Sequence, residues 1–289
     1  SYGSFNTHKE TVRVGSGLLG NHWAFDTRIS NIQSDGYRDR ATSDLKSYFL
    51  QGGYYGENTT LKLIAFGGKE KTYHAWDGIS REQLETDRTY NPNGAIKDDN
   101  LNKGNIIGFY DDQTDNYEQT NYQLIFNHLF SPEWHLNIAL HYTDGFGYYQ
   151  EYKNGRTLEE YGLKPFYLPE NTEAQTKTNL VRQKLVDSGF GGGVFSVDYK
   201  DEKLSASLGG GLNHYSNDHY GKVIWVKNYT EPLNPDHEYY RNNGSKTDGN
   251  INAKANYQIT KGLHAYADLQ YRYISYKIEG DNDKWDWTA

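Results

Sequence analysis

The chain has 289 residues with no Cys and no Met, and it carries 30 Lys and Arg against 38 Asp and Glu, a net charge of −8. The lack of Cys excludes disulfides, thiolate metal sites and a cysteine nucleophile. Because no basic patch stands out, we expect no nucleic acid among the partners.

Mean hydropathy is −0.93, and no stretch approaches the roughly 18–20 apolar residues of a membrane-spanning helix. A transmembrane β-barrel remains open, because its strands expose apolar groups only at alternate positions and therefore average out as polar. No apolar run near Ser1 could serve as a secretory signal. Since the first residue is Ser rather than Met, we expect the chain to have been processed or cut from a longer one.

Apolar and polar residues alternate along most of the chain, and helical periodicity is nearly absent. Ten strands are predicted, at about 4–17, 22–34, 44–56, 60–74, 116–130, 133–149, 189–200, 203–216, 247–259 and 263–278. Several exceed the roughly 5–6 residues usual in globular sheets. A tilted strand that crosses a membrane needs about 9–11 residues in the apolar band.

The alternation predicts which way the side chains of each strand point. The apolar positions expected to face away from a barrel lumen are Leu136, Ile138, Leu140, Ile251, Ala253 and Ala255. The polar positions expected to face the lumen are Asp26, Arg28, Asn137, His141, Asn252, Lys254, Asn256, Asp268, Gln270 and Arg272. Charged groups on the lipid side of such a barrel would cost several kcal/mol (about 2–4 at the bilayer midplane).

Short and long connections alternate strictly along the chain. The short ones are Leu19-Gly20-Asn21, Glu57-Asn58-Thr59, Ser131-Pro132, Asp201-Glu202 and Lys261-Gly262. The long ones are 35–43, 75–115, 150–188 and 217–246. This pattern is typical of an up-and-down barrel with tight periplasmic turns and long extracellular loops. It predicts one curved antiparallel sheet with no crossover and no helix longer than a few turns.

A soluble antiparallel sandwich is the alternative, because it also alternates apolar and polar residues. Strand length and the strict alternation of turns and loops favour the barrel. So does the gathering of Tyr and Trp near strand ends, where amphipathic rings sit at the headgroup level of a membrane. These residues are Trp23, Trp134, Tyr142, Tyr148, Tyr149, Tyr199, Tyr271, Tyr273 and Tyr276.

Several segments together resemble the barrel of TonB-dependent outer-membrane receptors. They are SFNTHKETVRVGSGLL at 4–19, WAFDTRISNIQSDGYRDR at 23–40, Gln113–Tyr117, Gly211–Tyr215 with Asp218–Val223, and Asp268–Tyr273. Their order and spacing cover most of the chain. They are more similar to the iron-complex receptors than to the larger glycan importers of the family.

The resemblance implies an all-β chain in which residues 1–289 form part of a transmembrane barrel in the outer membrane of a Gram-negative bacterium. The family also carries an N-terminal plug domain and a TonB box, neither of which is found here. Barrels with a plugged lumen have about 22 strands, against ten predicted, so we expect an internal portion with two open edges. The implied partners are the lipid bilayer, the plug, a TonB-type energy-coupling protein and a small metal chelate.

No catalytic residue, metal site or cofactor is predicted, because the chain lacks a G-x-S-x-G elbow, an H-E-x-x-H helix and a phosphate loop. The triplets Gly191–Gly193 and Gly209–Gly211 fall inside strands, where they serve close packing or bending. His214, Asp218 and His219 could ligate a metal. Their spacing does not match a ligand pair, so a polar loop is favoured.

The resemblance implies active uptake of a scarce nutrient, foremost a ferric siderophore or other iron complex, without covalent chemistry. Ligand contacts are expected at the loop end of the strands, where aromatic faces and cations such as Arg81 and Arg88 suit planar anionic chelates. The candidate residues are His74, Trp76, Tyr148, Tyr149, Tyr215 and His219. An interfacial girdle with solvated loops is the alternative for each residue.

Two other functions stay open at this point. One is import of a vitamin B12-like compound or a glycan by the same family. The other is a soluble, secreted β-protein that binds or cleaves glycans and uses loop aromatics as sugar platforms. Dependence on detergent separates the soluble class from the membrane class.

Overall fold

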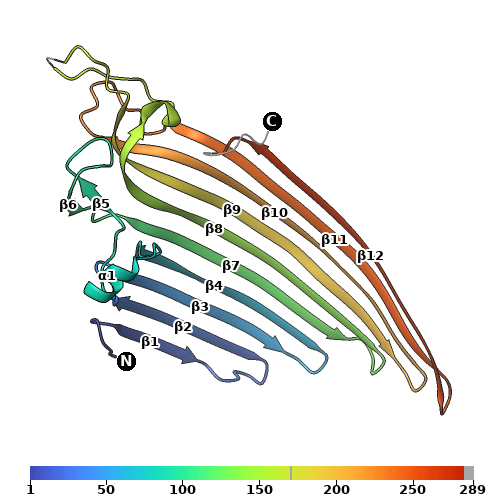
Figure 1. The fold of residues 1–289 in the computed structure, drawn as a ribbon. Coiled ribbons are helices and arrows are strands. Elements are labelled where there is room, and N and C mark those ends of the chain that lie inside the picture. Colours follow the sequence, from blue (N-terminus) through green and yellow to red (C-terminus); the bar gives the residue numbers. More distant parts are fainter. Residues whose placement is uncertain (170, 283–289) are drawn as a thin grey trace.

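The computed structural model describes residues 1–169 and 171–282, and one antiparallel sheet dominates it (Figure 1). The strands in sheet order are β1 (His8–Gly15), β2 (Trp23–Ser34), β3 (Ser43–Tyr55), β4 (Thr59–Tyr73), β7 (Thr114–Leu129), β8 (Trp134–Thr157), β9 (Lys177–Lys200), β10 (Leu204–Val226), β11 (Glu238–Thr260) and β12 (Leu263–Gly280). All ten predicted strands are present. Each pairs antiparallel with its neighbours, so the predicted up-and-down topology is confirmed.

The remaining elements lie in the long connections at one end of the sheet (Figure 1). They are the six-residue helix α1 (Arg81–Thr86), the hairpin of β5 (Ala95–Lys97) and β6 (Ile106–Phe109), and the 3-10 turn η1 (Leu158–Tyr161). Ser80 starts α1 with a capping box, in which its hydroxyl accepts from Gln83 N. Among the described residues, no helix is both long and apolar enough to cross a membrane.

The predictions of loops at 150–188 and 217–246 are wrong over much of these ranges, because the flanking strands extend into them. β8 continues to Thr157, β9 begins at Lys177, β10 continues to Val226 and β11 begins at Glu238. Backbone pairing persists there across irregularities, such as the shift between Val223 and Trp225. The alternation of apolar and polar residues in the sequence stops before these strand ends, because the strands there no longer separate one apolar face from one polar face.

The first turn also differs from its prediction. The chain leaves β1 at Gly15 and enters β2 at Trp23, so the connection covers 16–22 rather than three residues. Gly17, Gly20 and Asn21 adopt positive φ there. These are residue types that tolerate the left-handed region, which lets the wider turn form without strain.

The pairing register assigns every side chain to one of two faces of the sheet. One face, called here the apolar face, carries large hydrophobic side chains that are about half exposed or more. Examples are Val14, Phe25, Leu50, Leu63, Tyr122, Leu140, Leu208, Ile251 and Leu269. Of the side chains predicted to point outward, Leu140, Ile251 and Ala253 are exposed, whereas Leu136, Ile138 and Ala255 are partly covered. Among the described residues no second sheet packs over them, and so large an exposed apolar patch marks an interaction surface.

The opposite face, called here the polar face, carries cross-strand hydrogen bonds. His141 Nε2 lies 2.9 Å from Asn213 Oδ1, and Asn137 donates to Asp198 at 3.1 Å. Arg13 pairs with Asp26 at 2.7 Å. All ten side chains predicted to point to the lumen share this face by register. The predicted alternation is therefore confirmed for these positions in the middle of the sheet.

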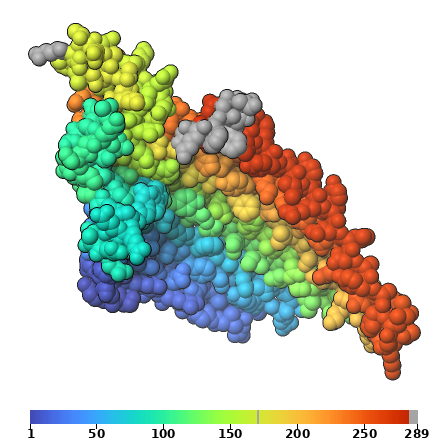
Figure 2. All heavy atoms as spheres, in the orientation of Figure 1, coloured from blue at the N-terminus to red at the C-terminus, as the bar shows by residue number. Residues whose placement is uncertain are grey.

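A compact lobe caps the loop end of β8–β11 and projects beyond the sheet (Figure 2). Its buried apolar side chains are Leu158, Tyr161, Phe166, Leu180, Val223 and Val226. Polar side chains tie the β4–β7 connection to this lobe. Asn154 donates to Ala95 O at 2.7 Å, fully buried Asn179 donates to Asp99 O at 3.2 Å, and Lys227 donates to Asn100 at 3.1 Å.

Leu180→Ala should destabilise this lobe by about 2–5 kcal/mol, because it leaves a cavity where Leu180 has no exposed surface. Hydrogen exchange of residues 158–168 should then be faster. The matched control is Ile107→Ala, since Ile107 is 66% exposed in the neighbouring hairpin and should change stability by less than about 0.5 kcal/mol. Equal effects of the two substitutions would contradict the assigned core.

Candidate functional site

A hollow of about 320 Å³ lies at the loop end of the sheet, and we call it the mouth pocket. Two cross-strand rows of β7–β11 build it. The first row is Tyr117, Gly147, Val186, His219 and Asn242, and the second is Asp115, Tyr149, Lys184, Gly221 and Tyr240. Both rows belong to the polar face. Except for Gly221, all of these residues line the pocket.

A cation lies between two aromatic rings in this pocket. Lys184 Nζ is 6.0 Å from the ring centre of Tyr149 and 5.8 Å from that of Tyr240, which is within the range of cation–π attraction. Gly221 lies between Lys184 and Tyr240 in the row. A Cβ at Gly221 would stand 2.4 Å from ring carbons of Tyr239 and Tyr240, so a glycine is needed for the two tyrosines to pack there.

Three aromatic side chains extend the wall of the pocket toward β4. The rings of His74 and Trp76 stack at 3.9 Å, and Tyr149 meets them edge-on at 6.0 and 5.8 Å. Trp76 is 55% exposed and covers His74, which is 1% exposed. Neither ring nitrogen of His74 has a hydrogen-bond partner within the described structure. Burial lowers the pKa of His74, which favours the neutral imidazole.

The backbone around Trp76 is held by side chains from other segments. Arg38, in the β2–β3 connection, donates to Ala75 O and to Asp77 O (3.0 Å for the latter), on either side of Trp76. Fully buried Asn91 donates to His74 O at 2.8 Å. The exposed indole is thus presented on a fixed backbone rather than on a free loop.

A buried ion-pair group supports the pocket from the side of the lobe. Glu151 accepts from Arg182 at 2.9 Å and from Lys153 at 2.8 Å, and its side chain is 9% exposed. Burial acts to raise the pKa of Glu151, but the positive charges of Lys153 and Arg182 outweigh it and hold the pKa below its ordinary value. Glu151 therefore remains a carboxylate and orders the strand ends of β8 and β9.

The structure brings most of the predicted ligand residues together. His74, Trp76 and Tyr149 form one aromatic cluster, and Tyr149 and His219 line the mouth pocket from the polar face. Tyr148 also borders the pocket, but the pairing register directs its side chain to the apolar face. Tyr215 lies apart: it is four residues nearer the turn end than His219, and its ring meets Phe190 at 6.4 Å. Arg81, on α1, pairs with Glu85 at 3.2 Å, and neither Arg81 nor Arg88 lines the pocket.

Lys184, Tyr240 and Asn242 line the pocket but were not predicted. All three fall in segments predicted to be loops, where no register could assign them to a face. The suggested metal ligands are not together: His214 and His219 lie on opposite faces, and Asp218 pairs with Arg241 at 2.9 Å. No cluster of three His, Asp or Glu suited to a metal occurs within residues 1–169 and 171–282.

Comparison with solved structures identifies the fold. The ferric-catecholate import receptor Fiu of E. coli K12, in its closed form, matches 96% of this chain with a TM-score of 0.65 and 13% identity. The unliganded ferric citrate transporter FecA matches 96% with a TM-score of 0.65 and 10% identity. The chain has the barrel fold of TonB-dependent receptors. The predicted family resemblance is therefore confirmed at the level of the fold.

A third structure of this receptor fold is the ferripyoverdine receptor of the outer membrane of Pseudomonas aeruginosa, with a TM-score of 0.59, 12% identity and 97% coverage of this chain. The chain spans 41% of Fiu, 36% of FecA and 37% of the ferripyoverdine receptor. No family model and no curated protein matches the sequence. At such identities the likeness shows the receptor barrel fold alone.

Arg38→Ala should loosen the backbone around Trp76 in this receptor-type barrel, because Arg38 donates to the carbonyls on both sides of it. Acrylamide quenching of Trp76, obtained as the difference between each protein and its Trp76→Phe partner, should increase. Arg81→Ala is the control, since Arg81 belongs to the same β4–β7 connection as Trp76 and its side chain is 91% exposed. Unchanged quenching in Arg38→Ala would show that Trp76 is held by its ring contacts alone.

The stacking of Trp76 on His74 should weaken in mild acid. Burial lowers the pKa of His74, and the positive charge of Lys153 lowers it further. The carboxylates of Glu151 and Asp115 act to raise this pKa, but burial outweighs them. The folded segment therefore takes up its proton at lower pH than an unfolded one, so its stability is complete above about pH 6.5 and falls as the pH drops below that value. Trp76 quenching should rise below pH 6.5, and His74→Phe should abolish this rise. A rise of equal size in His74→Phe would assign the titration elsewhere.

Proposed function

We propose that this chain forms part of the barrel wall of an outer-membrane receptor that takes up a ferric siderophore or another iron complex. The observation that carries the proposal is the mouth pocket, where Lys184 lies between Tyr149 and Tyr240 at the loop end of a receptor-type barrel sheet. Aromatic faces and a cation suit an anionic chelate whose ligand carries planar groups, through stacking and charge.

The residues proposed to contact the ligand are those that the pocket exposes. Trp76 offers its exposed face, Tyr149 and His219 line the hollow, and His74 supports Trp76 from beneath. Tyr148 borders the hollow, but its side chain points to the apolar face by register and would act only by ordering the strand. Tyr215 lies deeper on the polar face, so it would meet the ligand only after passage through the mouth. No step in this function requires a covalent intermediate, and no enzymatic activity is proposed.

The two faces of the sheet suggest two further partners. The exposed apolar face suits the hydrocarbon of the outer membrane. The polar face, with its Asp, Asn, His and Arg side chains, suits a plug domain that hydrogen-bonds inside the lumen. A plug of this kind would couple the barrel to a TonB-type energy-transducing protein.

Import of a glycan is the second candidate, because the exposed Trp76 ring is also the kind of platform on which a sugar ring stacks. A vitamin B12-like substrate belongs to the same class of transport. The soluble glycan-binding alternative is disfavoured, since its apolar side chains would have to pack inward, whereas this sheet leaves them uncovered.

Uptake by bacteria that express the whole protein tests the proposal. Cells should take up radioactive iron from at least one of three complexes, namely ferric citrate, a ferric catecholate and a ferric hydroxamate. Joint alanine replacement of His74, Trp76, Tyr148, Tyr149, Tyr215 and His219 should reduce this uptake by at least about tenfold, since stacking and charge each contribute about 1 kcal/mol or more.

The control replaces Asn21, Asn58 and Pro132 at the turn end, which should leave uptake unchanged. Equal losses from both sets would indicate misfolding. Full uptake by the loop-end variant would place the ligand elsewhere. Uptake of labelled cobalamin or an oligosaccharide, without that of any iron complex, would support the second candidate.

A further inference from the structure

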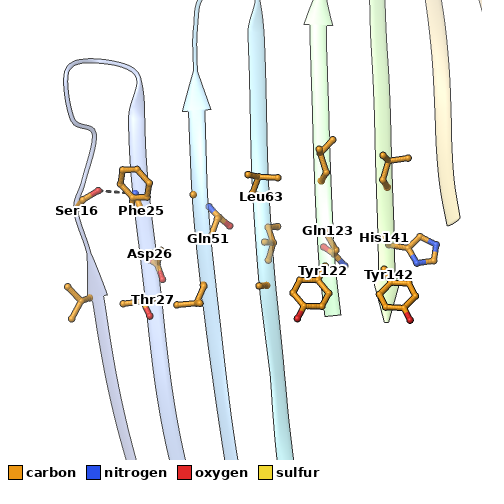
Figure 3. A pocket seen from close by; sticks show the side chains of 17 residues that line it. Ser16, Phe25, Asp26, Thr27, Gln51, Leu63, Tyr122, Gln123, His141 and Tyr142 are labelled. Carbon is orange, nitrogen blue, oxygen red and sulfur yellow. Dashed lines mark hydrogen bonds between the residues drawn. The ribbon is translucent and has the colours of Figure 1, made fainter. Parts of the chain in front are cut away.

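The apolar face ends along one cross-strand row. The row consists of Ile29, Tyr48, Gly67, Thr120 and Asp144, which pair in sequence across β2, β3, β4, β7 and β8. On its turn side, the same strands form a hollow of about 900 Å³, and Figure 3 shows its side chains, with Phe25, Leu63 and Tyr122 contributed by three different strands. On its loop side lies a second hollow of about 600 Å³.

The second hollow contains two lysines from adjacent strands. Lys46 and Lys69 stand directly opposite each other in the β3–β4 register, and their side chains are 63% and 69% exposed. Opposed like charges on neighbouring strands repel each other. An anion between the two ammonium groups would convert this repulsion into attraction.

Carboxylates flank the lysines without closing the site. Asp44 lies 3.4 Å from Lys46, Glu118 lies 3.8 Å from Lys69, and Asp144 lines the same hollow. Both ion pairs are solvent-exposed, and such pairs contribute little to stability. A multiply charged anion can therefore compete for the ammonium groups.

The two hollows follow each other along the same face of the same strands. Tyr48 donates its hydroxyl to Thr120 at 3.1 Å, and Gly67 beside it has no side chain to fill the row. One molecule can thus reach from the apolar hollow to the lysines. A free anion would occupy only the second hollow and would make no use of the first.

We infer that this part of the apolar face binds a phosphorylated lipid of the outer leaflet. The phosphate lies between Lys46 and Lys69, which act as point charges toward its oxygens. The acyl chains cover the apolar hollow around Leu50, Leu63 and Tyr122. This inference rests on the proposed membrane location, and it adds a site on the side of the sheet opposite to the mouth pocket.

The test uses the whole protein, extracted in detergent and reconstituted into phosphatidylcholine nanodiscs that contain either lipid A or fully dephosphorylated lipid A. Native mass spectrometry after delipidation should show retention of the phosphorylated form. Lys46→Gln and Lys69→Gln should each lower retention about fivefold, given about 1 kcal/mol for each cation near a lipid headgroup. Inorganic phosphate should not displace the lipid at a concentration equal to that of lipid A.

Lys62→Gln is the matched control, because Lys62 lies on β4 but on the polar face. It should retain lipid like the unsubstituted protein. Equal retention of both lipids, or full retention by the Lys46→Gln/Lys69→Gln double variant, would overturn the inference while leaving the proposed receptor function intact. A protein that stays soluble and monodisperse without detergent would overturn the proposed membrane location itself.

Discussion

The structure depends on continuous antiparallel pairing across ten strands. Because successive side chains point to opposite sides of a strand, one pairing register places the apolar side chains on one face of the sheet and the polar side chains on the other. A slip of one residue of β8 against β7 and β9 would carry Leu140 to the polar face and His141 to the apolar one. Inter-strand contacts of side chains follow this constraint, as in the bonds of His141 to Asn213 and of Asn137 to Asp198. Within residues 1–169 and 171–282, a cluster of buried apolar side chains occurs at the loop end, in the lobe around Leu180.

The same register also builds the mouth pocket. Lys184 and Tyr240 are 56 positions apart in the sequence, yet they share a row because β10 places only Gly221 between them. The aromatic cluster, by contrast, forms only if the backbone around Trp76, which lies outside the sheet, is held in place. Arg38 and Asn91 provide this by bonding the backbone on both sides of Trp76 and at His74. One wall of the pocket is therefore set by the sheet and the other by side-chain contacts to the backbone.

The sequence was sufficient to predict the strands near the middle of the sheet, since alternation such as Ile251, Asn252, Ala253 and Lys254 reports directly on the two faces. It was insufficient where strands leave the apolar band, as beyond Tyr149 and before Gly189, because no difference between faces remains to be read. Aromatic residues indicated the loop-end site. Lys184 was missed because its segment was predicted to be a loop, so no strand pairing could assign it to a face. The contact of Arg38 with Ala75 joins two connections, and no local pattern predicts such a pair.

The hydrogen bonds of Asn154, Asn179 and Lys227 join the β4–β7 connection to the lobe formed by the next two long connections. Surface segments of this kind are usually free to vary one at a time, since each is tolerated as a separate insertion. Here the three connections form a single structural unit. A foreign segment grafted onto the β4–β7 connection would leave the donors of the other two without partners, so such a graft requires exchange of the whole unit.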